Sequence, residues 1–257
     1  MIPEPLTSDK GTRETITQLH RWTDKLITFR TTRPVNYEFT PGQYARLGLP
    51  DDGGAMIWRA YSITSTTGED TLEFYGIVVE GGQFTSKLDV LKVGDAIWVD
   101  RQVFGFMTES RFIDGDDLWM LATGTGVGPF VSILRDQALW QRWRHLVLVH
   151  CVRHPDELAY RDELAAMAKA ADPGRLRLLQ LVTRDAAGDH LHGRITTLLQ
   201  SGALEQAAGL PLNAEQSRVM LCGNPAMIEE TRKLLHERGM KPVRRMNPGQ
   251  FVTENYW

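Results

Sequence analysis

Residues 118–129 read Leu-Trp-Met-Leu-Ala-Thr-Gly-Thr-Gly-Val-Gly-Pro, an apolar run followed by a glycine-rich turn. The run predicts a buried strand, and Pro129 suits the first turn of a helix. Glycines let a backbone turn tightly and approach a pyrophosphate closely. The turn lacks the Gly-Lys-Ser/Thr of a P-loop, and Pro129 stands where dehydrogenases place their last glycine. The stretch therefore predicts a strand–turn–helix unit that binds a nucleotide, with a plain glycine-rich turn as the alternative.

Beyond about residue 112 the chain alternates apolar runs with amphipathic stretches. We expect strands at 118–122, 146–152, 176–182 and 219–222, and helices from the glycine turn to about residue 140, over 160–171 and after Pro225. Strands that alternate with helices predict a parallel sheet that is covered on both faces. The C-terminal half is therefore expected to be an α/β parallel-sheet nucleotide-binding domain.

The first 105 or so residues show short β-rich runs, such as 26–30 and 72–79, between clusters of Gly, Pro and Asp. Short strands at this spacing predict a small antiparallel barrel. We expect a six-stranded β-barrel with one short helix near 86–91. The length of 257 residues allows two domains, which we place at 1–110 and 111–257.

Composition narrows the possible functions. The net charge of −3 gives no nucleic-acid signature, so no nucleic-acid partner is expected. The N-terminus lacks a signal-peptide pattern, and no run approaches the ~18 apolar residues of a membrane span, which predicts a cytoplasmic protein without a membrane partner. Two cysteines, Cys151 and Cys222, cannot form a disulfide framework or an all-cysteine iron–sulfur site. We interpret them as buried thiols and expect no metal site.

Two further motifs accompany the glycine turn. Arg59-Ala60-Tyr61-Ser62 ends a predicted strand, and Cys222-Gly223-Asn224-Pro225 follows another. Their order, together with the ending Glu254-Asn255-Tyr256-Trp257, resembles the ferredoxin–NADP reductase family, and more closely its bacterial flavodoxin/ferredoxin reductase branch. The resemblance covers nearly the whole chain. It implies an FAD-dependent NADPH oxidoreductase that transfers hydride between NADPH and FAD and exchanges single electrons with ferredoxin or flavodoxin.

The resemblance assigns the first motif to the flavin. Arg59 would bind the flavin phosphates, Tyr61 would stack on the ring, Ser62 would lie at the N5 edge, and Ala60 would complete this part of the site. The chemistry fits, because guanidinium groups match phosphate oxygens and phenol rings stack on flat π-systems. Alternating side-chain direction along a strand would put Arg59 and Tyr61 on one face. A strand with no ligand is the alternative.

Two other segments would complete the flavin site in the same family. Gly82, Thr85 and Ser86 would contact the pyrophosphate, and Thr85 and Ser86 also fit as helix N-caps. The terminal tail would fold back on the flavin, with Tyr256 near the ring and Trp257 on the adenine, which implies FAD rather than FMN. Packing of this aromatic pair against the protein core is the alternative.

The nicotinamide nucleotide would bind the second half of the chain. By the resemblance, the NADP contacts are Thr125, Gly126, Arg153, Thr183, Arg184, Arg194, Cys222, Gly223, Asn224 and Pro225. The three arginines would bind the 2′-phosphate, which favours NADP(H) over NAD(H); solvated surface arginines are the alternative. The residues expected closest to the reaction are Ser62, Cys222, Glu254 and Tyr256. Cys222 would pack and orient, whereas Glu254 would carry protons or bind the nicotinamide amide, or simply be solvated.

The electron acceptor is less sharply predicted. Residues 232–245 hold Arg232, Lys233, Arg238, Lys241, Arg244 and Arg245 against the single acid Glu237, so this segment could steer an acidic ferredoxin or flavodoxin. A solvated helix and loop is the alternative, and a monomer is expected. Three other functions stay open: the reductase component of an oxygenase, an NADPH:flavin reductase that uses flavin as a substrate, and a nucleotide-binding regulatory protein.

Overall fold

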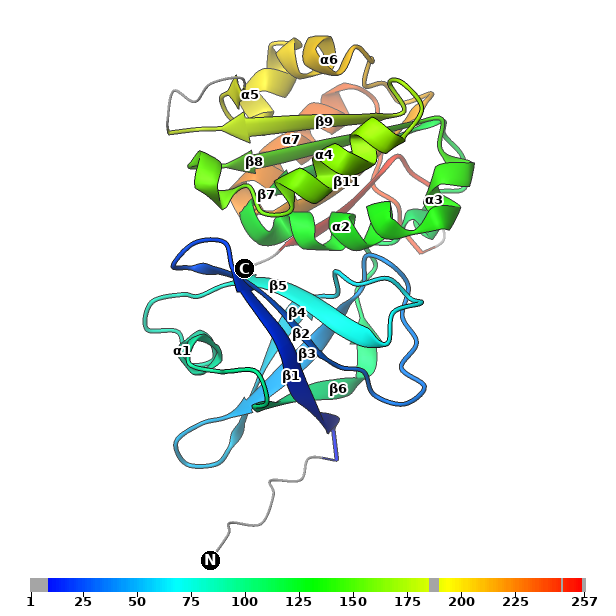
Figure 1. Cartoon of the computed structure of the whole chain (residues 1–257). Coiled ribbons are helices and arrows are strands. Elements are labelled where there is room, and N and C mark those ends of the chain that lie inside the picture. The colour runs from blue at the N-terminus through cyan, green and yellow to red at the C-terminus, as the bar shows by residue number, and fades with distance from the viewer. Residues whose placement is uncertain (1–8, 185–189, 246, 256–257) are drawn as a thin grey trace, which may run out of the picture.

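The computed structural model describes residues 9–184, 190–245 and 247–255. They form two halves, each built around one six-stranded sheet, with helix α2 (Gly128–Arg135) lying between the upper sheet and the lower barrel in Figure 1. Within these residues, no helix has both the length and the apolar character needed to cross a bilayer.

The N-terminal half is an antiparallel barrel. Its strands are β1 (Gly11–Arg21), β2 (Leu26–Thr32), β3 (Tyr44–Pro50), β4 (Met56–Ser62), β5 (Thr71–Ile77) and β6 (Ala96–Phe104), which lie in the order β4-β3-β6-β1-β2-β5. A bridge between Ile63 and Phe74 joins the two ends of this order. Alternate side chains such as Ile16, Phe29 and Leu47 fill the interior, as the period of a strand requires. The predicted six-stranded antiparallel barrel is confirmed.

The short helix beside the barrel, α1 (Thr85–Asp89), corrects one prediction. Its N-cap is Phe84, which makes no side-chain capping bond, so the predicted capping role of Thr85 and Ser86 is wrong. Thr85 Oγ1 instead accepts from the Val79 N–H at 3.1 Å, and Ser86 Oγ donates to the Gly82 carbonyl at 2.8 Å. Both hydroxyls therefore tie the preceding turn together.

The C-terminal half is a parallel sheet. Its strands are β7 (Asp117–Thr123), β8 (His145–Val152), β9 (Leu176–Val182), β10 (Leu191–His192), β11 (Ser217–Gly223) and β12 (Phe251–Asn255), in the order β10-β9-β8-β7-β11-β12. All the pairings in it are parallel. The four predicted strands are confirmed, and the sequence analysis missed the two edge strands β10 and β12.

Helices cover both faces of this sheet, as predicted. Besides α2, they are α3 (Gln137–Arg142), α4 (Arg161–Ala170), α5 (Ile195–Gln200), α6 (Ala203–Ala208) and α7 (Pro225–Glu237), with short 3₁₀ turns η1 (Glu109–Arg111), η2 (Gly124–Val127) and η3 (Pro155–Glu157). Leu118 and Met120 pack with α2 to α4, whereas Trp119 and Leu121 pack with α5 to α7. The helix predicted to reach residue 140 is broken at Asp136, which is extended and caps α3 through the Ala138 N–H at 3.0 Å.

A buried carboxylate joins the two halves. Glu73 on β5 is only 5% exposed. It forms ion pairs with Arg30 of the barrel at 2.6 Å and with Arg135 of α2 at 2.9 Å, and accepts from Thr64 Oγ1 at 2.8 Å. Burial alone would raise the pKa of Glu73, but Arg135, Thr64 and Arg30 together hold it below its ordinary value. The carboxylate is therefore charged, and both of its oxygens have ion-pair or hydrogen-bond partners.

Further polar contacts extend this junction. Arg135 also pairs with both carboxylate oxygens of Glu163 on α4, at 2.7 and 2.8 Å. The Tyr160 hydroxyl lies 3.2 Å from Glu73 and 2.9 Å from Thr28 Oγ1 of the barrel. Tyr160 has a φ of +60°, a left-handed conformation that a tyrosine rarely adopts. The contacts of its hydroxyl and ring offset that backbone cost. Because Tyr160 is the N-cap of α4, these contacts fix the start of α4 against the barrel.

Removal of Glu73 should destabilise the whole molecule. Glu73→Ala leaves two arginines in the junction without their shared partner, and we expect the free energy of unfolding to fall by about 3–5 kcal/mol. Urea unfolding followed separately by barrel and sheet probes measures this loss. Glu229→Ala is the control, because Glu229 pairs with Arg232 on the exposed side of α7 and should cost under about 1 kcal/mol. Equal losses in the two variants would contradict the role of the junction.

Candidate functional site

The predicted flavin motif lies on β4, which pairs with β3 in the barrel wall. Leu47 lies opposite Arg59, and Tyr44 lies opposite Ser62. Arg59 and Ala60 are exposed, whereas Ser62 is fully buried. The Arg59 guanidinium donates to the carbonyl of the neighbouring Trp58 at 2.9 Å. The strand thus presents one cation on the barrel surface and carries the hydroxyl of Ser62 into the wall.

Tyr61 occupies a defined slot within the same strand. Its ring lies 6.1 Å from Phe29 and 5.6 Å from Phe84, and it is 6% exposed. A Cβ at Gly76 would come within 2.4 Å of the ring, so glycine is needed there. Burial raises the pKa of the Tyr61 phenol well above its ordinary value, which keeps it neutral. The slot fixes the ring, and its stacking on a flavin stays a prediction.

The glycine-rich turn follows β7, as predicted. Gly124 opens η2 with a φ of +53°, and Pro129 lies in the first turn of α2. A Cβ at Gly126 would lie 2.4 Å from the carbonyl oxygen of Cys222, so no other residue fits there. Thr125 is 2% exposed, and its Oγ1 has no hydrogen-bond partner among the described residues. A buried hydroxyl of this kind is costly unless a ligand completes it.

The second turn lies directly against the first. Gly223 has a φ of +134°, and a Cβ there would lie 2.1 Å from Thr123 Oγ1. The same hydroxyl accepts from the Asn224 N–H at 2.8 Å. Asn224 Oδ1 accepts from the Ala226 N–H at 2.9 Å and so caps α7, in which Pro225 is the first residue. The predicted residues Thr125, Gly126, Cys222, Gly223, Asn224 and Pro225 therefore come together on one edge of the sheet.

Glu254 reaches from this edge to the segment that follows the last barrel strand. It lies opposite Cys222 in the pairing of β11 with β12, and its carboxylate accepts from the backbone N–H of Phe106. Burial raises the pKa of Glu254 to about 7, although the Phe106 N–H lowers it. Burial, and then the nearby Glu254 carboxylate, raises the pKa of the Cys222 thiol well above its ordinary value. The thiol therefore stays protonated, as a packing role requires.

The predicted arginines gather at the same end of the sheet. Arg153 follows β8 and Arg184 follows β9, and the Arg184 N–H donates to the Arg153 carbonyl at 3.0 Å. Arg194 is the N-cap of α5, which it opens as predicted. All three are exposed, and Thr183 is half-buried, with its Oγ1 donating to Val152 at 3.2 Å. Tyr256 and Trp257 lie outside the described residues.

The sequence analysis missed two residues of this edge. Thr123 packs closely against Gly223 and accepts a hydrogen bond from the Asn224 N–H. Nothing in its position before the glycine turn predicted these contacts. His150 in the middle of β8 is 1% exposed and lies 3.0 Å from the Gly124 carbonyl. A histidine inside an otherwise apolar strand could have marked His150 as a candidate from the sequence. Its hydrogen bond connects β8 to the glycine turn.

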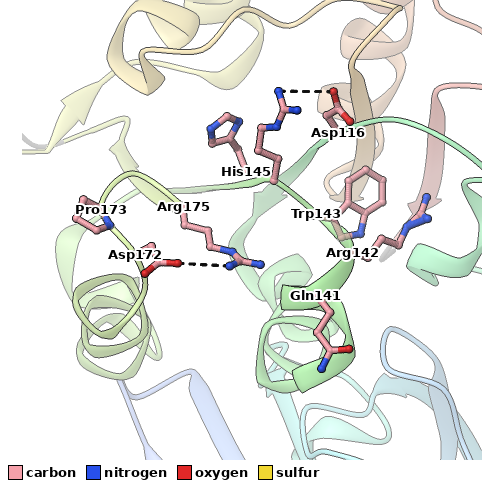
Figure 2. A pocket seen from close by; sticks show the side chains of 9 residues that line it. Asp116, Gln141, Arg142, Trp143, His145, Asp172, Pro173 and Arg175 are labelled. Carbon is pink, nitrogen blue, oxygen red and sulfur yellow. Dashed lines mark ion pairs between the residues drawn. The ribbon is translucent and has the colours of Figure 1, made fainter.

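A cavity of about 490 Å³ lies at the opposite, amino-terminal edge of the sheet (Figure 2). Arg144 pairs there with Asp116 at 3.9 Å, and Arg175 pairs with Asp172 at 3.5 Å. None of the predicted site residues within the described part of the chain lines this cavity. Ligands of open α/β sheets bind at the carboxyl ends of the strands, so the two glycine turns mark the candidate site and this cavity does not.

Comparison with known proteins agrees with this geometry. An oxidoreductase FAD-binding domain matches residues 17–101, and an oxidoreductase NAD-binding domain matches residues 120–233. A flavodoxin/ferredoxin–NADP reductase of Shigella flexneri is 41% identical over 243 residues, which cover 94% of this chain and 97% of the relative. The chain belongs to the flavodoxin/ferredoxin–NADP reductase family.

Two further relatives support this membership. A ferredoxin–NADP reductase of Azotobacter vinelandii is 37% identical over 247 residues, which cover 94% of this chain and 95% of the relative. A crystal structure of a ferredoxin–NADP⁺ reductase from Neisseria gonorrhoeae, with bound FAD and NADP, has a TM-score of 0.92 at 38% identity and covers 97% of this chain and 100% of that one. The predicted family, two-part fold and cofactors are confirmed.

The pKa of Glu254 gives a test of the site in this family member. Its pKa is about 7 in the folded state against 4.5 as the ordinary value, so the folded protein loses stability as the pH rises through about 7. Glu254→Gln removes that loss. Urea unfolding at several pH values should give a variant that matches wild type near pH 4.5 and exceeds it by on the order of 2 kcal/mol at pH 8.

The exposed substitution Glu229→Gln on α7 controls for the simple loss of a negative charge. A stability difference between Glu254→Gln and wild type that does not change with pH would contradict the buried, proton-binding carboxylate.

Proposed function

We propose that this chain is a ferredoxin/flavodoxin–NADP(+) reductase, an FAD-dependent enzyme that moves electrons between NADP(H) and a small electron carrier. One observation carries the proposal: the two interlocked glycine turns lie at the carboxyl edge of the sheet, and Glu254 connects that edge to the segment that leaves the barrel. When bound, FAD and the nicotinamide supply the chemistry, which is hydride exchange followed by release of single electrons to the carrier. The protein supplies position and electrostatics.

The FAD would be held by the barrel. The residues that we assign to it are Arg59, Ala60, Tyr61, Ser62, Gly82, Thr85 and Ser86, with Tyr256 and Trp257 of the tail. The exposed guanidinium of Arg59 suits a phosphate, and the rigid slot around Tyr61 suits a flat ring. A Cβ at Gly82 would lie 2.4 Å from Thr85 Oγ1, so the close packing of this turn requires glycine at that point.

The NADP(H) would be held by the sheet edge. The unpartnered Thr125 hydroxyl suits the pyrophosphate, and Gly126 and Gly223 let the backbone approach it. Arg153, Arg184 and Arg194 would bind the 2′-phosphate, with Thr183 beside them. None of these three arginines has an ion pair with an acid of the described residues, so their charges suit an anionic ligand.

Glu254 is assigned a proton-handling role in this enzyme. A carboxyl group with a pKa near 7 can hold a proton on one of its oxygens and release it at working pH, which is the property of a general acid–base group. Cys222 lies opposite it with a protonated thiol, and would shape the nicotinamide pocket with Asn224. Ser62 would supply the hydroxyl near the flavin edge.

The carrier would dock near the link between the halves, on the surface formed by Phe106, Arg111 and Ile113, called here the linker surface. Phe106 is 76% exposed and Ile113 is 74% exposed, while the Arg111 guanidinium lies 5.6 Å from the Phe106 ring. The backbone N–H of Phe106 binds Glu254, so this surface adjoins the proposed site. Exposed apolar groups beside a cation suit an acidic ferredoxin or flavodoxin.

The basic segment 232–245 is a weaker docking candidate. Arg232 and Lys233 pair with Glu229 at 3.3 and 3.8 Å, and Arg238 pairs with Glu205 at 2.8 Å. Three of its six basic side chains are therefore paired with two acids that precede the segment.

We assign the remaining properties on similar grounds. Residues 1–110 would be the FAD unit and residues 111–257 the NADP unit, since β6 ends at Phe104 and β7 begins at Asp117. The two buried, unpaired thiols suit a reducing cytoplasm. We propose a monomer, because one chain carries both cofactor sites.

Nucleotide preference tests the function directly. The purified protein should be yellow, and without oxygen NADPH should bleach it faster than NADH. Arg184→Ala should raise the KM for NADPH roughly 10-fold or more and leave that for NADH nearly unchanged, because one charged phosphate contact is lost. Arg175→Ala, at the opposite sheet edge, is the control. A colourless protein would favour a flavin reductase, and equal use of both nucleotides would refute the arginine assignment.

Carrier docking is tested by separating two electron acceptors. Arg111→Glu should lower NADPH-driven reduction of an acidic ferredoxin about 10-fold at low salt and flatten its salt dependence, because the surface then repels the carrier. Reduction of ferricyanide, which needs no docking surface, should be retained. Lys241→Glu tests the rival segment, and Val35→Ala, 91% exposed on the barrel, is the control. A larger effect of Lys241→Glu would move the docking face to 232–245.

A further inference from the structure

His150 is a buried imidazole that the proposed chemistry does not use. It lies in the middle of β8, opposite Ala122 of β7 and Gln180 of β9, and is 1% exposed. A polar ring in such a place is costly unless its nitrogens are bonded. Only one of the two ring nitrogens of His150 has a hydrogen-bond partner among the described residues. Nδ1 has no partner within the described residues, while Nε2 lies 3.0 Å from the carbonyl oxygen of Gly124.

The partner of Nε2 fixes the form of the ring. A carbonyl oxygen only accepts hydrogen bonds, so Nε2 must carry the hydrogen and Nδ1 must be bare. Burial lowers the pKa of His150 to about 4, although the bond to Gly124 raises it. The ring is therefore neutral at any pH at which the enzyme works, and is neither a charge for a phosphate nor a proton donor to the reaction.

The bond acts on the turn through the peptide plane. The carbonyl of Gly124 and the N–H of Thr125 belong to one planar trans peptide, so they point in opposite directions. Gly124 has a φ of +53°, a conformation that suits glycine, and it opens the 3₁₀ turn η2 that contains this peptide. The hydrogen bond from His150 holds the Gly124 carbonyl toward the sheet. The Thr125 N–H, on the other side of the same peptide, therefore points away from the sheet.

We propose that His150 is a positioning residue for the nucleotide: its Nε2–H fixes the Gly124–Thr125 peptide so that the N–H and hydroxyl of Thr125 face the pyrophosphate of NADP(H). The inference rests on the proposed function, because it needs a nucleotide at this turn. The buried, unpartnered Oγ1 of Thr125 is the independent observation that a ligand completes the turn.

The proposal separates two parts of the nucleotide. NADP⁺ carries the pyrophosphate, whereas adenosine 2′,5′-bisphosphate keeps the 2′-phosphate and lacks the pyrophosphate bridge. A positioning role of His150 affects the first ligand and spares the second. A general packing role would weaken both, because it would disturb the whole edge of the sheet.

The test is calorimetric binding of both ligands to the FAD-loaded protein. His150→Leu should weaken NADP⁺ about 10-fold, which corresponds to the loss of one hydrogen bond, and change the affinity for adenosine 2′,5′-bisphosphate less than about 2-fold. His150→Gln places an amide N–H near the position of Nε2 and should restore most of the NADP⁺ affinity. His150→Asn places it near Nδ1 and should not.

Equal weakening of the two ligands, an unchanged affinity for NADP⁺ in His150→Leu, or equal failure of the Gln and Asn variants would each overturn the proposal. Nitrogen NMR of the wild-type protein tests it without any variant: the hydrogen must be found on Nε2, and a hydrogen on Nδ1 would refute it. If the wild-type protein bound neither ligand, the proposed function itself would fail.

Discussion

The arrangement of the two halves depends on one carboxylate, that of Glu73. It lies in the barrel, yet Arg135 of the sheet half is one of its two arginine partners. A buried ion pair is stabilising only when its geometry is good and its remaining polar atoms are bonded, and here Thr64 and Tyr160 complete it. An enzyme with a cofactor site on each half needs such a junction, since an error of 1 Å between reacting groups is costly.

The two glycine turns impose a second constraint, which explains why both motifs occur in one chain. β7 and β11 are neighbours in the sheet, so the turns that follow them must pass side by side. Gly126 has room only for a hydrogen because of the Cys222 backbone, and Gly223 has room only for a hydrogen because of Thr123. Each glycine therefore makes room for the backbone or side chain of the opposite turn. Neither motif could change alone without moving the other strand.

The sequence predicted what depends on local patterns and missed what depends on neighbours. Strands 146–152 and 176–182 were placed at or within one residue of their observed bounds, because apolar runs show directly in the sequence. β12 was missed, since it becomes a strand only by pairing with β11. The predicted caps at Thr85 and Ser86 failed because both hydroxyls found closer partners in the preceding turn.

Charge pairing distinguishes the two edges of the parallel sheet. At the amino-terminal edge several arginines have an acidic partner: Arg218 binds Asp114 at 2.6 Å, and Arg142 binds Glu109 at 3.0 Å. The cavity there is also bordered by paired charges (Figure 2). At the carboxyl edge, Arg153, Arg184 and Arg194 have no ion pair with any acid that the structure describes. Arginines placed together without acids repel one another, and an anion removes that cost. Arg153, Arg184 and Arg194 therefore give the carboxyl edge positive charge that the described acids do not neutralise, which is consistent with the anionic ligand proposed for it.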